Sequence, residues 1–232
     1  MKEILNAELN GCKYTILGCS VKGAGKELNQ DSFCIEANGE KIICLSADGL
    51  GSAINSEIGS QTVCRVARDI IVNNGIIDEF PIIIKKAWAS QLQVKPISCD
   101  TTFKFIVVDD KEIVCGGIGD GWILGIVDNK FFEIKTSNNF SNQTDSVMSV
   151  GYEDKFHIAR IPYNEIQLLS LATDGFSEDM ASDQIESFLG QCLLEINNDS
   201  RKFLDDLEHM IENWPISTNQ DDKTIILCGR IK

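Results

Sequence analysis

Aspartate residues recur at the ends of apolar runs, several of them beside glycine. Asp48 and Asp174 each close an apolar run and precede a glycine, whereas Asp221 stands just before one. The full set comprises Asp31, Asp48, Asp120, Asp174, Asp221 and Asp222. A carboxylate at the end of a buried strand is costly unless a positive charge compensates it. Carboxylate oxygens are ligands of hard cations, so these residues predict a metal site.

Glycine after aspartate has two alternative explanations. It lets the backbone turn sharply and can bring a carbonyl oxygen close to the same cation. Taken singly, however, an Asp-Gly pair is more typical of an ordinary turn. The joint pattern is more informative, because two strand ends and one strand start could bring distant carboxylates to one rim of a β-sandwich.

The elements that must position these residues are mostly strands, with helical patterns in two places. Predicted strands cover residues 13–20, 31–37, 41–47, 102–108, 112–118, 122–127, 155–161, 166–172 and 224–228. Predicted helices cover residues 52–73, 80–93, 182–194 and 201–214, and residues 137–149 are expected to form a surface loop or short flap. The order predicts an α+β fold in which antiparallel sheets lie face to face, with a helix pair on each outer face. At 232 residues, we expect a single domain spanning 1–232.

Composition excludes several classes of partner and location. The net charge of −14 argues against nucleic acid and against an anionic membrane surface. No apolar run reaches the roughly 18–20 residues of a membrane span, and the N-terminal residues lack the apolar core of a signal peptide. The nine cysteines are scattered without a CxxC pair and are expected to be small buried hydrophobic residues. A cytoplasmic protein is the expectation.

Five ordered segments resemble the signatures of the metal-dependent (PPM, type 2C) serine/threonine protein phosphatases, most closely a compact bacterial branch. The resemblance extends from about Gly18 to Leu227, and Ser98–Thr102 occupies the place of the family's Gly-Thr-Thr segment. The five segments are Gln30-Asp31, Ala47-Asp48-Gly49-Leu50-Gly51-Ser52, Gly119-Asp120-Gly121, Ala172-Thr173-Asp174-Gly175 and Asp221-Asp222-Lys223-Thr224.

The resemblance implies a four-layer α-β-β-α sandwich of two antiparallel β-sheets flanked by helix pairs, holding two Mg²⁺ or Mn²⁺ ions. Asp48 would bridge both ions, Asp174 and Asp221 would complete one site, and the carbonyl of Gly49 would serve the other. Asp31 would bind a metal directly or through its waters. A water bridging the two ions would then attack the phosphoester, and the Ser or Thr alkoxide would leave.

A third, weaker cation site is also implied by the resemblance. Asp120 matches the position that helps to hold this ion in many members, and Glu178 lies where a second carboxylate often stands.

The chain departs from the family pattern at three positions. Lys26 stands where the family has a phosphate-binding Arg, so a phosphate would meet a point charge instead of a bidentate fork. Gln30 replaces a common Glu and would reach the metal through its side chain or a water. Leu50 replaces the His of many eukaryotic members, so a water or the leaving group's own basicity would have to replace that general acid.

Three functions stay open. The first is an active phosphatase, a signalling hydrolase acting on phosphoserine or phosphothreonine proteins, opposed in some pathway by a cognate kinase and expected to be a monomer. Its catalytic residues would be Asp48, Asp31 and Lys26. The second is a catalytically weak or inactive pseudophosphatase that acts as a regulatory binding module. The third is a small-molecule phosphoesterase on the same fold.

Overall fold

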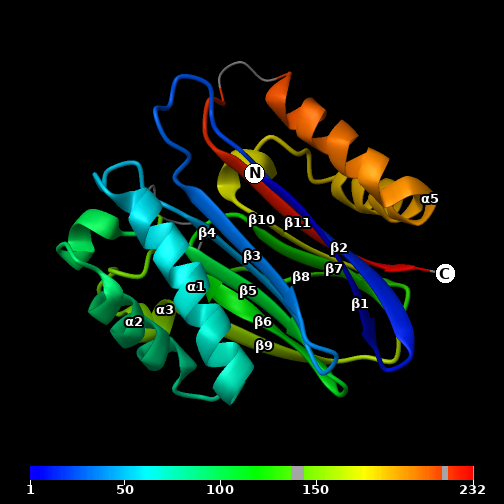
Figure 1. The fold of residues 1–232 in the computed structure, drawn as a ribbon, viewed down its shortest axis with the longest axis horizontal. Helices are drawn as coiled ribbons and strands as arrows, with labels where there is room; N and C mark the ends of the chain where they lie inside the picture. Colours follow the sequence, from blue (N-terminus) through cyan, green and yellow to red (C-terminus); the bar gives the residue numbers. More distant parts are fainter. Residues whose placement is uncertain (137–143, 216–218, 232) are drawn as a thin grey trace.

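The chain folds into two antiparallel sheets packed face to face, with helices on both outer faces (Figure 1). The computed structural model describes residues 1–136, 144–215 and 219–231. The strands are β1 Lys2–Leu9, β2 Cys12–Val21, β3 Asp31–Ala37, β4 Ile42–Asp48, β5 Phe103–Val108, β6 Glu112–Ile118, β7 Trp122–Val127, β8 Lys130–Glu133, β9 His157–Pro162, β10 Ile166–Ala172 and β11 Lys223–Ile231. The helices are α1 Ser56–Asn74, α2 Phe80–Gln91, α3 Tyr152–Lys155, α4 Asp174–Ser177 and α5 Ile185–Glu212, with a short 3₁₀ helix η1 at Pro96–Cys99.

One sheet has the strand order β1-β2-β11-β10-β7-β8 and the other β3-β4-β5-β6-β9. All the strand pairs are antiparallel. The list of predicted strands was incomplete, because it omitted β1 and β8. Both are outer strands of the six-stranded sheet, and most of their side chains are exposed or half-buried, so their apolar patterns are weak.

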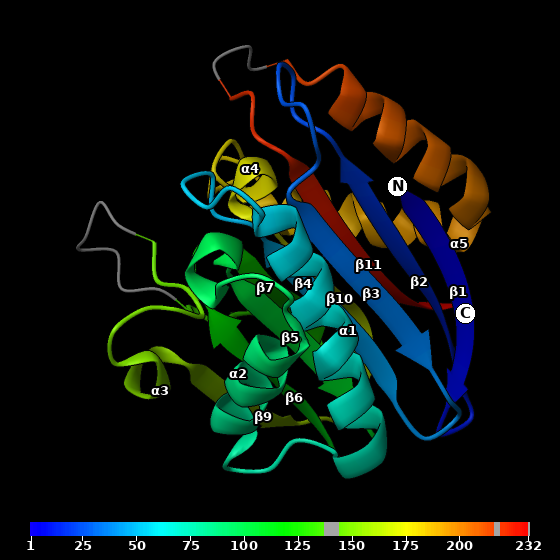
Figure 2. The same ribbon diagram turned by 60° about the vertical axis from the view of Figure 1, so that its left-hand side comes forward.

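Three hydrophobic clusters lie between the four layers and hold them together. The first packs α1 and α2 on the five-stranded sheet, the second fills the space between the sheets, and the third packs α5 on the six-stranded sheet. Helix α1 buries one face, because Val63, Ala67 and Ile71 recur every four residues and are buried in the first cluster. Figure 2 shows α1 and α2 on one side of the sheets and α5 on the other. The predicted α-β-β-α sandwich is therefore confirmed.

The second helix pair differs in detail from the prediction. Two helices are present as predicted, but no loop separates them: within α5, Ile185–Glu212, they meet at a kink at Asp199, whose φ is −152° and ψ 90°. The Oδ1 atom of Asp199 accepts a hydrogen bond from the backbone N–H of Lys202 at 3.0 Å, as the N-cap residue of the second helix does. Ile196, near the end of the first helix, is buried against the sheet.

Residues 137–143, in the predicted flap, lie outside the described residues, so its Asn142 and Gln143 are not placed. The rest of that segment leads into α3. Within the described part of the chain, no helix combines the length and apolar character needed to cross a membrane.

Candidate metal centre

Four of the predicted carboxylates lie at one end of the sandwich, and both sheets contribute to them. Asp31 begins β3 and lies opposite Asp48, the last residue of β4. Asp174 follows β10, and Asp221 shortly precedes β11, the neighbouring strand (Figure 2). The hydroxyl of Thr173 donates to Oδ2 of Asp31 at 2.8 Å and so joins the two sheets at this rim.

Among the described residues, the carboxylates of Asp31 and Asp48 form no direct ion pair. Burial raises the pKa of Asp31 to about 7, and hydrogen bonds from threonine hydroxyls oppose that shift. Burial also raises the pKa of Asp48 well above its usual range, and the charges of Asp31, Asp174 and Asp221 raise it further. The Oδ1 atom of Asp31 is buried and has no hydrogen-bond partner among the described residues. A hard divalent cation would satisfy this oxygen and relieve the repulsion, so the donor set fits Mg²⁺ or Mn²⁺.

The side chains are not gathered as a closed set of ligands. Over residues 1–136, 144–215 and 219–231, no group of three or more His, Cys, Asp and Glu side chains encloses a single point closely enough to hold a metal ion. Instead, the ammonium group of Lys26 forms an ion pair with the carboxylate of Asp221.

Lys26 is brought to the rim by the loop between β2 and β3. Its Nζ forms an ion pair with Oδ1 of Asp221 and lies 3.2 Å both from Oδ2 of Asp222 and from Oε1 of Gln30. Although burial disfavours the charged ammonium, these carboxylates raise the pKa of Lys26. The fully buried carboxylate of Asp222 anchors the loop, because it accepts the backbone N–H groups of Gly23 and Gln30, each at 2.8 Å. Asp222 belongs to the set of aspartates that predicted a metal site, and in the structure it holds this loop instead.

The Asp48–Gly49 turn is held by the segment that resembles the family's Gly-Thr-Thr motif. The backbone N–H of Asp48 donates to Oγ1 of Thr102 at 3.0 Å, and the hydroxyl of Thr101 donates to the carbonyl of Asp48 at 2.8 Å. Only glycine fits at position 49, since a Cβ there would lie 2.7 Å from the Cβ and the carbonyl oxygen of Ser56 at the start of α1. The turn is therefore fixed in place, and the role of the Gly49 carbonyl as a ligand stays a prediction.

Asp100 supports the same turn from behind and was not predicted as a functional residue. Its buried carboxylate accepts hydrogen bonds from the backbone N–H of Thr101 at 2.9 Å, the hydroxyl of Ser146 at 2.7 Å and the backbone N–H of Met148 at 3.1 Å. Its carbonyl accepts the N–H of Leu50 at 3.0 Å. Asp100 thus connects the metal rim to the segment that follows the flap.

Asp120 and Glu178 lie beside this rim. Oδ2 of Asp120 accepts the hydroxyl of Thr144 at 2.7 Å. Glu178 is exposed, and its pKa is raised by partial burial and by the charges of Asp174 and Asp120. The two residues are thus electrostatic neighbours of Asp174, whereas their role at a third cation stays a prediction.

Lys104 is the functional candidate that sequence reasoning missed most completely. It lies in β5 among apolar neighbours, and only 1% of its surface is exposed. Its Nζ donates to the backbone carbonyl of Asp120. Burial lowers the pKa of Lys104, and the charges of Asp174, Asp48, Asp120 and Asp31 oppose that shift. The signal that could have found it is a lysine inside an otherwise apolar strand, since a buried ammonium needs nearby negative charge.

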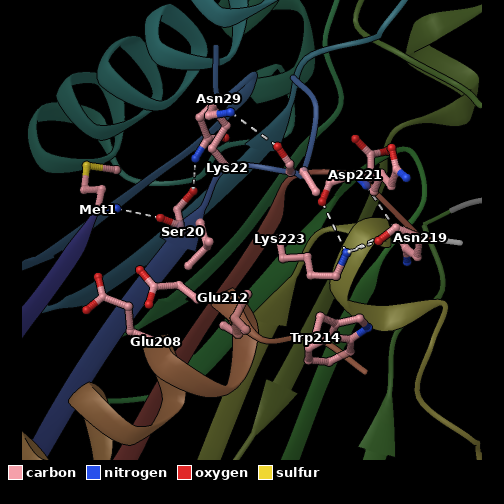
Figure 3. A pocket seen from close by; sticks show the side chains of 15 residues that line it. Met1, Ser20, Lys22, Asn29, Glu208, Glu212, Trp214, Asn219, Asp221 and Lys223 are labelled. Carbon is pink, nitrogen blue, oxygen red and sulfur yellow. Dashed lines mark hydrogen bonds between the residues drawn. The ribbon is translucent and has the colours of Figure 1, made fainter. Parts of the chain in front are cut away.

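Two cavities adjoin the rim. An open depression of about 660 Å³ lies over the carboxylates and is lined by Lys26, Glu178 and Asp221 among others. A larger cavity of about 830 Å³ lies toward α5 and shares Asp221 with the rim. Figure 3 shows Lys223 and Trp214 in this second cavity, where the Lys223 ammonium lies 5.5 Å from the centroid of the indole ring. The depression, which exposes both Lys26 and Asp221, is the one placed to admit a phosphate group.

Comparisons with known proteins agree with this arrangement. The family model for protein phosphatase 2C matches residues 23–212, which is most of the chain. The search of curated proteins found no match.

Solved structures share the fold at low sequence identity. The catalytic domain of serine threonine protein phosphatase PstP in complex with 2 manganese ions is similar over 94% of this chain and 99% of its own, with a TM-score of 0.65 and 15% identity. RsbX in complex with magnesium covers 99% of this chain and 100% of its own, with a TM-score of 0.66 and 16% identity. Serine/threonine phosphatase Stp1 from Staphylococcus aureus covers 97% and 96%, with a TM-score of 0.67 and 16% identity.

The family match spans the loop of Lys26, the Asp48–Gly49 turn, the Gly119–Gly121 turn and Asp174. The solved phosphatases have the same fold over nearly the whole chain. The chain therefore belongs to the protein phosphatase 2C family.

Proposed function

We propose that this chain is a Mg²⁺- or Mn²⁺-dependent protein phosphatase that hydrolyses phosphoserine or phosphothreonine in protein substrates. The observation that carries the proposal is the rim itself. Carboxylates from both sheets meet there, and the buried Oδ1 of Asp31 has no partner among the described residues. The manganese and magnesium of two similar structures support a divalent metal in this chain.

Asp48, Asp174 and Asp221 would hold two cations, together with the carbonyl of Gly49 and with Asp31. Bound divalent cations would lower the pKa of an attacking water and balance the negative charge that develops on the phosphoryl group. Asp31 and Asp48 are held rigidly by antiparallel pairing and would keep the cations in a fixed position relative to the substrate. Rigid placement matters because the phosphoryl oxygens must be oriented before attack.

Lys26 would bind a phosphate oxygen from the side of the open depression. Its ammonium is already charged and is held at the rim by Asp221 and Asp222. A substrate phosphate would compete with Asp221 and Asp222 for the ammonium of Lys26, and a cation would compete with Lys26 for the carboxylate of Asp221. Lys26 would therefore exchange its partners when the site is filled. Partner proteins would supply much of the substrate selection, and a cognate kinase and a monomeric state stay predictions.

A second candidate function is a regulatory binding module without turnover. The ion pair between Lys26 and Asp221 favours it, because an internal cation occupies a proposed metal ligand. The clustered carboxylates favour the enzyme, because a scaffold has no physical need for them.

Hydrolysis of a phosphothreonine peptide, measured with EDTA, Mg²⁺ or Mn²⁺, separates these functions. We expect phosphate release that depends on the metal and is lost in Asp48→Asn and Asp174→Asn. Asp206→Asn, a matched change of an exposed residue on α5, should keep full activity. A folded protein that releases no phosphate with any metal would favour the binding module. A strong preference for small phosphate esters over the peptide would favour a small-molecule phosphoesterase.

A further inference from the structure

The ammonium group of Lys104 is buried at the metal end of the space between the two sheets. Lys104 lies in β5 and pairs with Ser46 of β4 and Gly117 of β6. Its exposure of 1% means that bulk water cannot solvate the charge. Among the described residues, its Nζ donates one hydrogen bond, to the carbonyl of Asp120, although an ammonium can donate three.

The surroundings of Lys104 supply charge without direct ion pairs. Among the described residues, no carboxylate oxygen lies within 4.0 Å of its Nζ. The carboxylates of Asp174, Asp48, Asp120 and Asp31 nevertheless all attract it. Lys104 therefore offsets the negative charge of these four carboxylates together, as a bound cation would, and does not pair with one of them.

The turn at 119–121 is shaped around this ammonium. Gly121 has a φ of +107°, and a Cβ at this position would lie 2.3 Å from the carbonyl of Ala172 and 3.1 Å from Nζ of Lys104. The ammonium thus fills the space between the Asp120 turn and the end of β10, which leads directly to Asp174. A side chain at position 121 would displace either the turn or the ammonium.

We propose that Lys104 is a built-in cation that takes the place of a third divalent ion beside Asp120. This inference rests on the proposed function, because it assumes that the remaining carboxylates bind two divalent ions. Lys104 repels a further cation from the Asp120 side of the rim, so the wild-type protein binds two ions and no more. Lys104 is a positioning residue here, because it acts through the carboxylates and the Asp120 turn.

The test counts bound Mn²⁺ by isothermal titration calorimetry and by the electron paramagnetic resonance signal of free Mn²⁺. Wild-type protein should bind two Mn²⁺ per chain. Lys104→Met, which keeps an unbranched side chain one atom shorter and removes its charge, should bind one more. Adding Asp120→Asn to Lys104→Met should remove the extra ion, and Lys104→Arg, which keeps the charge, should bind two.

Several results would overturn the inference. One is the finding that the wild-type protein binds three Mn²⁺ and the Asp120→Asn variant binds two. This result would count against the inference even if Lys104→Met fails to fold. Another is a folded Lys104→Met protein whose Mn²⁺ stoichiometry and affinities equal those of the wild type. Wild-type protein that binds no Mn²⁺ at all would refute the proposed metal centre, and this inference with it. Two tight ions with no effect of Lys104→Met would leave the metal centre intact and refute only the role of Lys104.

Discussion

Asp31 and Asp48 lie directly opposite each other on neighbouring antiparallel strands, at the end of the five-stranded sheet. Like charges at such a position destabilise a sheet. Burial adds a desolvation cost to this repulsion, and the two effects raise the pKa of both residues. The arrangement costs stability in the absence of a bound cation, and the proposed metal centre gives it a physical reason.

Removal of divalent metal should therefore destabilise the protein. At a free Mn²⁺ concentration about 100 times the dissociation constant, one bound ion would add about 2.7 kcal/mol. For a chain of this size, that corresponds to a rise in melting temperature of roughly 5–10 °C over the EDTA-treated protein. Differential scanning calorimetry with and without Mn²⁺ measures the shift.

Asp48→Asn gives the control for that measurement. It removes one of the two opposed charges, so the metal-free variant should melt higher than metal-free wild type, and Mn²⁺ should raise its melting temperature much less. Equal shifts in the variant and the wild type would contradict the assignment of Asp48 as a ligand.

Lys26→Arg should lower the KM for a phosphothreonine peptide, because a guanidinium can bind two phosphate oxygens at once. We expect a decrease of roughly threefold to tenfold, which corresponds to about 1 kcal/mol. Steady-state kinetics at saturating Mn²⁺ measure this change. The matched exchange Lys86→Arg, on the exposed side of α2, should leave KM unchanged. An unchanged KM in Lys26→Arg would argue against phosphate binding by this residue.

Asp222→Ala should release the loop that carries Lys26. It leaves the backbone N–H groups of Gly23 and Gln30 without their acceptor and removes an ion pair. Loss of these buried interactions should cost about 2–4 kcal/mol in the free energy of unfolding, measured with urea. KM should rise as well. Asp206→Ala is the control, and equal stability of the two variants would mean that the loop is held by other contacts.

The cysteines should react with a thiol reagent in a graded and pH-dependent way. All nine are free, and only Cys12 and Cys34 are partly exposed. Burial raises the pKa of Cys34 to about 11, so its thiolate fraction is small at pH 7.5 and should grow as the pH rises. Mass spectrometry after brief treatment with iodoacetamide at pH 7.5 should find at most these two sites modified. In guanidinium chloride all nine should react. Rapid modification of a buried cysteine such as Cys44 in the native protein would contradict the described core.

The sequence alone determined the layer order, nine of the strands and the carboxylates at the rim. Those features depend on local patterns: alternating or continuous apolar runs, a four-residue helical stripe, and aspartate beside glycine where a strand ends. The strands β1 and β8 escaped detection because most of their side chains are exposed or half-buried, which weakens the apolar pattern. The two helices of α5 were predicted, but the break between them was drawn as a loop because Asn- and Asp-rich stretches are typical of turns, whereas in the structure they meet at the single residue Asp199.

The tertiary structure decided how charges are distributed around those carboxylates. The sequence pointed to Lys26 and to Asp222 but not to the contacts that they make, and it did not reveal the buried charge of Lys104. Their partners come from other strands and loops: Lys26 meets Asp221 across 195 residues of chain, and Lys104 reaches the turn at Asp120. The energy of a buried charge depends on every other charge within a few ångströms, and no local pattern contains that information. Sequence therefore predicted where a metal would bind, and the folded chain determined which of its own cations lie beside those carboxylates.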